Sequence, residues 1–371
     1  MDIGSLNQSA LANLYFGGYQ LVEEKILSSA ATSVTFSGLN GDVDEEYMLK
    51  ARIVNGASGQ SVYVRPNGDA SNYGTQRLYG SSSSVGANRA VTGGIIRIAN
   101  DSALGSINFS DTTIYAKSGF VRTAISTGSN DVITTAIGSI DMYGGSWNNI
   151  ADNITSIVVG SDVSNGLGVG THLLLFKKTL TGLVATSGMR TGKLNVKGNI
   201  NCGVMQKIYQ NTLAAAATSV TISGLDGNTD VLYELRCRFI NNNASASGYY
   251  IRPNNDAGAN YGYQHLDGSS TTVTAYRGTA YDSILLSWNA VANGHLLQSE
   301  IKFYAKSGFI RTGIITTSED ISTTTVTGIM LHGVCWNNTA DNITSLVVLA
   351  SQANGLGIGT VIELFALRRK V

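Results

Sequence analysis

One stretch of nine residues occurs twice in this chain, and it limits the possible folds more than any other feature. Residues 147–155 read WNNIADNIT and residues 336–344 read WNNTADNIT, a difference at a single position. In both copies an apolar segment follows, and then a glycine-rich turn, NGLGVGT from Asn165 or NGLGIGT from Asn354. Repeated matches in the same order predict two copies of one structural module.

The composition of these modules is typical of short strands joined by turns. The chain holds 43 glycines but only 2 prolines, together with many of the β-branched, aromatic and turn-forming residues. Residues 47–54 and 233–240 alternate apolar and polar side chains, which predicts a strand with one buried face. We expect roughly eight short strands in each module. The predicted fold class is all-β, with two tandem antiparallel β-sandwich domains of jelly-roll-like form.

The repeats also set the expected domain boundaries. We expect an N-terminal arm over residues 1–20, module 1 over residues 21–178, a connector over residues 179–204 and module 2 over residues 205–371. The connector has no equivalent inside either module. It is too apolar for a flexible tether, so we expect it to pack on a domain or on a neighbouring chain.

The last strand of each module carries a prediction about its two faces. Leu173 and Leu175 of module 1 are matched by apolar residues in module 2, so we expect them to point into the core. Leu174, in contrast, is matched by Glu363. We expect that second face to meet solvent or a partner.

Charge and cysteine content exclude several classes of protein. Charged residues make up 13% of the chain, and 25 basic and 25 acidic side chains cancel, so the basic surface of a nucleic-acid binder is not expected. No stretch approaches the roughly 18 apolar residues of a membrane span, and the first residues lack the pattern of a secretory signal. Cys202, Cys237 and Cys335 are too far apart for a metal motif or a disulfide framework. We expect them to be small buried side chains.

The duplication also tests for catalysis, because residues of a site inherited by both copies should match. None of the four histidines, His172, His265, His295 and His332, is matched by a histidine in the other copy. The glycine runs 166–170 and 355–359 precede a strand and not a helix, so they do not form a dinucleotide site; we expect turns that need close backbone approach. No enzymatic activity, metal or cofactor is predicted. A hydrolase or lyase acting on polysaccharide is kept as a third hypothesis, after the two given at the end of this section.

The side chains that both copies share are aromatic, amide and acidic. They are Trp147, Asn148, Asn149 and Asp152 in the first copy and Trp336, Asn337, Asn338 and Asp341 in the second. In the structural interpretation the Trp anchors the core while the Asn and Asp side chains satisfy backbone donors in a turn. In the alternative interpretation the same residues form a glycan site, with the indole as a stacking platform and the amides binding hydroxyl groups.

Two further groups of matched polar residues invite an interpretation. Asp69 and Asp256 lie in matched Asn-rich loops. Asp69 with Asn67 and Asn72 offers oxygen ligands for a weak calcium site, but a single acid in each loop is a poor ligand set for calcium. Lys117 and Arg122 are matched by Lys and Arg in module 2. We expect them on a solvated strand face or in a contact between subunits.

The repeated motifs resemble those of one group of viral proteins. The strand ends SGLNGD and SGLDGN, the YAKSGF segments followed by Val-Arg-Thr or Ile-Arg-Thr, and the WNN motifs are similar to β-sandwich units of tailed-bacteriophage virion proteins. These are decoration, head-fibre, tail-fibre and baseplate components. The resemblance covers nearly all of both modules. It implies a non-enzymatic homo-oligomer, with a trimer favoured, that sits on the virion beside other virion proteins and in some cases binds host glycans.

Two hypotheses lead from these observations. The first is a structural protein of a phage virion that contributes to host-surface attachment. It is made in the host cytoplasm without a signal peptide, and it binds neither nucleic acid nor the interior of a membrane. The alternative is a carbohydrate-binding protein with paired β-sandwich modules, in which Trp147 and Trp336 are the stacking platforms.

Overall fold

The chain forms two β-sandwiches in the computed structural model, which describes residues 19–93, 95–179, 205–269, 271–291, 293–322 and 326–368. Module 1 has twelve strands. They are β1 (Tyr19–Ile26), β2 (Ser33–Ser37), β3 (Asp44–Val54), β4 (Gln60–Pro66), β5 (Tyr73–Ser81), β6 (Ser84–Gly93), β7 (Ile96–Ser102), β8 (Ile107–Tyr115), β9 (Arg122–Ile133), β10 (Ala136–Trp147), β11 (Ser156–Ser161) and β12 (His172–Thr179).

Module 2 repeats the same strands in the same order. They are β13 (Met205–Thr212), β14 (Ser219–Ser223), β15 (Asp230–Ile240), β16 (Ser247–Pro253), β17 (Tyr261–Ser269), β18 (Thr272–Tyr281), β19 (Ile284–Val291), β20 (Leu296–Tyr304), β21 (Arg311–Ile321), β22 (Gly328–Trp336), β23 (Ser345–Ala350) and β24 (Val361–Arg368). The described residues contain no helix, and therefore none that is long and apolar enough to cross a membrane.

Each module packs a large antiparallel sheet on a small one. In module 1 the large sheet has the order β1-β12-β3-β8-β9-β10-β5-β6 and the small sheet the order β2-β11-β4-β7. Module 2 has the equivalent orders, β13-β24-β15-β20-β21-β22-β17-β18 and β14-β23-β16-β19. The predicted all-β fold with two tandem antiparallel sandwiches is therefore confirmed.

The prediction of roughly eight strands in each module was wrong, because the structure has twelve. The additional strands come largely from residues 73–102, which contain tight hairpins such as the pairing of Ser81 with Ser84. The strand β6 contains mainly small and polar residues, and it is an edge strand of the large sheet. In addition, β1 begins at Tyr19, inside the segment predicted to be an arm.

The core of each module fills the space between its two sheets. In β3, Tyr47, Leu49 and Ile53 point inward and are fully buried, as the alternating pattern predicts. Leu173 and Leu175 of β12 are also fully buried, which confirms their predicted orientation. Cys237 and Cys335 are buried and unpaired, also as predicted, whereas Cys202 lies outside the described residues.

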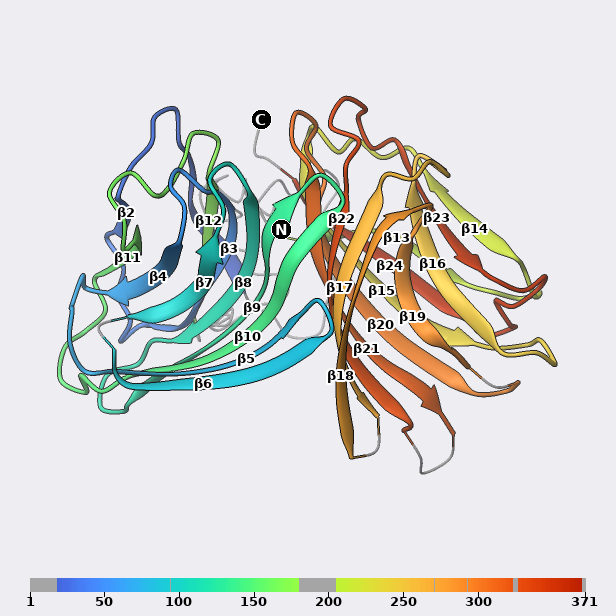
Figure 1. The fold of residues 1–371 in the computed structure, drawn as a ribbon, viewed down its shortest axis with the longest axis horizontal. Helices are drawn as coiled ribbons and strands as arrows, with labels where there is room; N and C mark the ends of the chain where they lie inside the picture. Colours follow the sequence, from blue (N-terminus) through green and yellow to red (C-terminus); the bar gives the residue numbers. More distant parts are fainter. Residues whose placement is uncertain are drawn as a thin grey trace, which may run out of the picture.

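The two modules pack against each other through the outer faces of their large sheets. Figure 1 shows the four layers, with the small sheets outermost and β10 of module 1 next to β17 and β22 of module 2. Apolar side chains from both modules form one buried cluster at this boundary, among them Phe109, Leu174, Tyr304 and Ile314. The second face of β12, which carries Leu174, therefore meets the other module.

Charged side chains are buried in the same boundary. Asp111 Oδ2 lies 2.5 Å from Lys50 Nζ within module 1 and 2.8 Å from Lys302 Nζ of module 2. Burial by itself raises the pKa of Asp111, but the two ammonium groups outweigh it and lower that pKa to about 2. The strand that carries Lys50 was predicted to have one buried face; its polar face is buried too, because module 2 covers it.

The turns of the two modules follow their sequence signals. Both prolines, Pro66 and Pro253, end a strand of the small sheet. The matched glycine runs come close to backbone, since a side chain at Gly168 would lie 2.9 Å from the carbonyl oxygen of Val54. This confirms that the runs are close-packed turns.

Candidate functional site

The most similar segments of the two modules form the same buried cluster. Trp147 and Trp336 are fully buried. The indole N–H of Trp147 donates to Asp69 Oδ2 over 2.8 Å, and Tyr73 stacks on the ring with centroids 6.3 Å apart. Module 2 repeats the bond to Asp256 at 2.8 Å. Because burial of an indole N–H requires a partner, this bond fixes the ring in the core.

The interpretation of the two tryptophans as stacking platforms was wrong. Neither Trp147 nor Trp336 has an exposed ring face that a sugar can contact. The calcium interpretation of the neighbouring loops meets a similar obstacle. Asp69 uses Oδ2 for the indole and Oδ1 for the backbone and hydroxyl of Ser71, and Asp256 accepts the indole N–H in module 2. These carboxylates hold the loop and the core together.

The amides and acids of the same motif close a turn. Asn149 Oδ1 accepts the backbone N–H groups of Ala151 and Asp152 at 3.2 and 3.1 Å, and its Nδ2 donates to Asp152 Oδ2 at 2.7 Å. Asn338 and Asp341 form the same turn in module 2. The turn leads from the large sheet to the small one, which is the structural role expected of an Asx turn. The binding role of these residues stays a prediction.

Arg122 and its counterpart Arg311 are buried, so the expectation of a solvated strand face was wrong for them. The guanidinium carbon of Arg122 lies 5.1 Å from the indole centre of Trp147, and that of Arg311 lies 4.9 Å from the ring of Trp336. Each donates to the carbonyl oxygen of the acid in its turn, Asp152 or Asp341. A cation–π contact and a backbone bond therefore hold these arginines inside the protein. Lys117 is exposed, as expected.

A cavity of about 520 Å³ opens between the two sheets of module 1. Tyr63, Arg65 and Arg97 line it from the small-sheet side, and Arg77 and Tyr143 from the large sheet, with Asp162 at the rim. The guanidinium of Arg77 is paired with Asp141 at 2.6 Å. Burial by itself lowers the pKa of Arg77, but the pairing with Asp141 outweighs it and raises that pKa. Planar guanidinium groups beside tyrosines suit carboxylate or sulfate groups on a sugar.

Module 2 fills the equivalent position with rings. His265 replaces Arg77 and His332 replaces Tyr143. The His265 ring stacks on Tyr263 with centroids 5.9 Å apart and lies 5.5 Å from His332. Burial lowers the pKa values of His265 and His332 to about 4 and about 3, so both are neutral near pH 7. The arginine-lined cavity is therefore a property of module 1.

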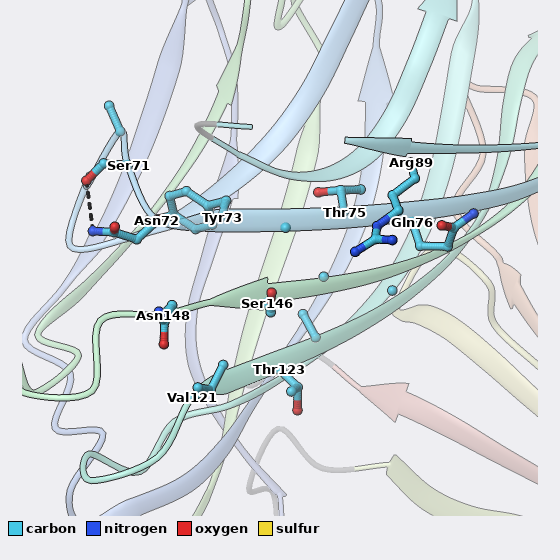
Figure 2. A pocket seen from close by; sticks show the side chains of 15 residues that line it. Ser71, Asn72, Tyr73, Thr75, Gln76, Arg89, Val121, Thr123, Ser146 and Asn148 are labelled. Atoms are coloured by element: carbon cyan, nitrogen blue, oxygen red, sulfur yellow. Dashed lines mark hydrogen bonds between the residues drawn. The ribbon is translucent and has the colours of Figure 1, made fainter. Parts of the chain in front are cut away.

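A second hollow of about 1000 Å³ lies on the outer face of the large sheet of module 1. We call it the outer furrow. Figure 2 shows its side chains on β5, β6, β9 and β10 and on the loops before β5 and after β10. Gly74 and Gly144 form part of its floor, and Gln76 and Arg89 stand at one end. Asn148 lines it at the other end, the one member of the predicted Trp147 motif that does so.

Sequence reasoning missed the cavity of module 1 because it searched for residues that both copies share. The cavity depends on residues that differ, with Arg77 in place of His265 and Arg97 in place of Leu285. The sequence feature that could have indicated the cavity is the divergence of residues 81–100 from their counterparts in module 2. A segment that differs between two copies of a module is where one copy can carry a site that the other lacks. Among the described residues, no three His, Cys, Asp or Glu side chains are arranged to hold a metal.

Comparisons with known proteins give no family for this chain. No protein-family model matches it, and no curated protein matches it. Among solved structures, domains LG4-5 of the mouse laminin alpha1 chain share 13% identity with a TM-score of 0.19, covering 94% of this chain and 89% of that chain. Alginate lyase Aly36B shares 11% identity with a TM-score of 0.20, covering 41% of this chain and 82% of that chain. PNGase F from Flavobacterium meningosepticum shares 8% identity over 95% of this chain and 96% of that chain, with a TM-score of 0.18.

Proposed function

We propose that this protein is a non-enzymatic structural component of a bacteriophage virion surface, of the decoration, fibre or baseplate type. The motif resemblance to tailed-phage β-sandwich proteins supports the virion location. The observation that carries the structural role is the boundary between the modules. There, Asp111 joins Lys50 and Lys302 inside an apolar cluster, so two sandwiches are held as one unit and not as two tethered domains.

The virion location is tested on purified particles of the phage that encodes the chain. We expect mass spectrometry to detect the protein in stoichiometric amounts after gradient purification, and immunogold labelling to place it on the particle surface. A gradient-purified, infectious particle that lacks the protein would overturn the virion proposal.

A second function, binding of an acidic glycan during host attachment, is favoured by the cavity of module 1. The alternative of paired carbohydrate-binding modules requires an equivalent site in each module. The cavity with Arg65, Arg77 and Arg97 belongs to module 1, and rings occupy the equivalent position in module 2. We therefore assign one glycan site to each chain, with carboxylate or sulfate groups bound by guanidinium.

Calorimetric titration with dextran sulfate and hyaluronate oligosaccharides, and with neutral dextran as a control ligand, tests this second function. We expect the acidic oligosaccharides to bind and Arg97→Ala to weaken binding at least tenfold. Lys117→Ala is the matched control, because Lys117 is an exposed cation of module 1 outside this cavity. An equal loss of affinity in both variants would indicate nonspecific charge attraction and would contradict the assignment of the glycan site to this cavity.

A further inference from the structure

The contact between the two modules is not symmetric. Module 2 uses the end of its outer sheet face that carries Leu266, Tyr304, Ile314 and Leu331, which we call face A. Module 1 uses the opposite end of its equivalent face, with Phe109, Ile137, Ile140 and Leu174, which we call face B. One contact therefore leaves face A of module 1 and face B of module 2 without a partner among the residues that the structure describes.

Face A of module 1 is exposed although its sequence matches the buried face A of module 2. Four matched pairs show this difference in exposed fraction. They are Tyr304 at 2% and Tyr115 at 53%, Ile314 at 4% and Ile125 at 58%, Leu331 at 6% and Met142 at 40%, and Leu266 at 7% and Leu78 at 37%. Phe120, exposed at 69%, extends the same apolar surface. A contiguous apolar surface of this kind marks a contact site.

Face B shows the reverse difference. Ile137 and Ile140 of module 1 are fully buried. Their counterparts in module 2, Val326 and Ile329, are exposed at 54% and 62%. Face B of module 2 thus keeps an apolar part at Val326 and Ile329, whereas Phe109 and Leu174 are matched by the polar residues Gln298 and Glu363.

The polar residues of face A explain why that face accepts one kind of partner. In module 2, Gln264 Oε1 accepts from the backbone N–H of Ser82 at 2.9 Å, and Gln264 Nε2 donates to the Ser82 carbonyl at 3.1 Å. Arg277 donates to the carbonyl oxygen of Gly138 at 2.5 Å. Gly262 lies directly against the backbone of Thr135 and leaves no room for a side chain. These three residues contact the hairpin turns of module 1 at backbone level.

Module 1 carries the same three residues in its outer furrow. Gln264, Arg277 and Gly262 are matched by Gln76, Arg89 and Gly74. All three line the furrow, and Figure 2 labels Gln76 and Arg89. They are retained although Arg89 lies in the central segment where the two copies differ most.

We propose that a second copy of this chain docks in the outer furrow, with face B of its module 2 on face A of module 1. This inference rests on the proposed structural role and names the surface through which it is exercised. The contact is heterologous, because two different faces meet, so it repeats from chain to chain and builds a closed ring or an open filament. Each step uses the same two faces that meet within one chain, with Gln76, Arg89 and Gly74 in the places of Gln264, Arg277 and Gly262.

The contact between chains is weaker than the contact between the two modules of one chain, and charge is one reason. The pair Asp111–Lys302 that spans the two modules is matched by Glu300 and Thr113. Contacts between chains therefore lack this ion pair, and they also lack the covalent link that raises the effective concentration of the modules. Association between chains is consequently reversible and depends on protein concentration.

Two charge substitutions and their mixture test the proposal. Ile125→Asp damages face A of module 1, and Ile329→Asp damages face B of module 2. Both side chains are exposed, so each variant is expected to fold. Leu104→Asp is the matched control, because Leu104 is exposed at 64% in the turn between β7 and β8, away from face A of module 1.

Light scattering from about 1 to 100 µM gives the readout, a range that covers typical reversible protein contacts. We expect the wild type and Leu104→Asp to gain mass with concentration, while Ile125→Asp and Ile329→Asp each keep the mass of one chain. An equal mixture of the two variants should reach the mass of two chains, because each supplies the face that the other lacks.

A wild type with the mass of one chain at 100 µM would overturn the proposal. So would a mixture that stays at one chain, because an intact face A and an intact face B would then be present without binding each other. Either outcome leaves the virion test unaffected.

Discussion

At the scale of single residues, the two modules preserve one group of contacts almost atom for atom. The indole–carboxylate bond measures 2.8 Å in both, and the tyrosine stacks on the ring at 6.3 or 6.2 Å. An arginine guanidinium also lies over each indole, at 5.1 Å in module 1 and 4.9 Å in module 2. The sequence identified these residues as the most similar part of the chain. Whether a matched Trp is a core anchor or an exposed platform depends on the loop around it, which the residue types alone do not specify.

Trp147→Phe tests this structural role. We expect a loss of about 2 kcal/mol in the free energy of unfolding, because the Asp69 carboxylate loses a donor in a partly buried position. Urea denaturation followed by circular dichroism measures it. Ile150→Ala in the same turn is the control, since that side chain is half exposed. A loss below about 0.5 kcal/mol, the range of ordinary surface substitutions, would assign the indole a role outside the core.

At the scale of strands, the alternating pattern predicted β3 and β12 and the inward direction of Leu173 and Leu175. It did not predict β5 and β6 as separate strands, because their Ser, Gly and Asn residues are also those of loops. The cavity of module 1 was missed for a related reason. It depends on which side chains of β5, β7 and β10 converge across two sheets, and Arg77, Arg97 and Tyr143 are far apart in the sequence.

The ring cluster of β17 and β22 leads to a prediction about acid. Burial lowers the pKa values of His265 and His332 to about 4 and about 3, below the value near 6.5 of an unfolded chain. The unfolded state therefore binds more protons between about pH 6.5 and pH 3, and stability falls as the pH is lowered through that window. We expect the double variant His265→Phe/His332→Leu to lose less stability than the wild type between pH 7 and pH 4.5. The difference should be on the order of 2 kcal/mol.

Urea denaturation at the two pH values measures this difference. The variant Tyr143→Phe, at the position of module 1 that matches His332, is the control and should keep the wild-type pH dependence, because it leaves the pair of Arg77 and Asp141 in place. A double variant as acid-sensitive as the wild type would show that carboxylates, and not the two histidines, set the acid stability of module 2.

At the scale of the whole molecule, the sequence predicted two modules but not their contact. Only the apolar face of β3 was predicted to be buried, because Lys50 and Arg52 on its other face are charged. Module 2 covers them, and the charges are neutralised in pairs or stacked, as with Arg52, whose guanidinium carbon lies 3.9 Å from the ring centre of Phe309. A periodic pattern reports which face of a strand is apolar. It does not report that a second copy of the module will cover the other face.

Asp111→Asn tests the contact between the modules. The substitution leaves Lys50 and Lys302 buried without their shared carboxylate, and we expect the free energy that holds the modules together to fall by about 3 kcal/mol or more. Cys335 reports on the opening, because it lies in face A of module 2 under the carbonyl oxygen of Thr134, at 3.6 Å. Burial raises the pKa of that thiol to about 12, so alkylation requires the modules to separate.

Alkylation rates measured by mass spectrometry, in a Cys202→Ser background, distinguish separation of the modules from global unfolding. We expect Asp111→Asn to speed alkylation of Cys335 at least tenfold while Cys237, inside the core of module 2, keeps its slow rate. Acid should also weaken the contact between the modules of the wild type, which small-angle scattering measures in place of alkylation, because only the thiolate is alkylated. The pKa of Asp111 is lowered to about 2 in the folded protein, so the contribution of this carboxylate is present above about pH 4 and is lost as the pH falls toward 2. Equal acceleration of both cysteines would show that the variant unfolds module 2 as a whole, and that the contact between the modules is not an independent element of the fold.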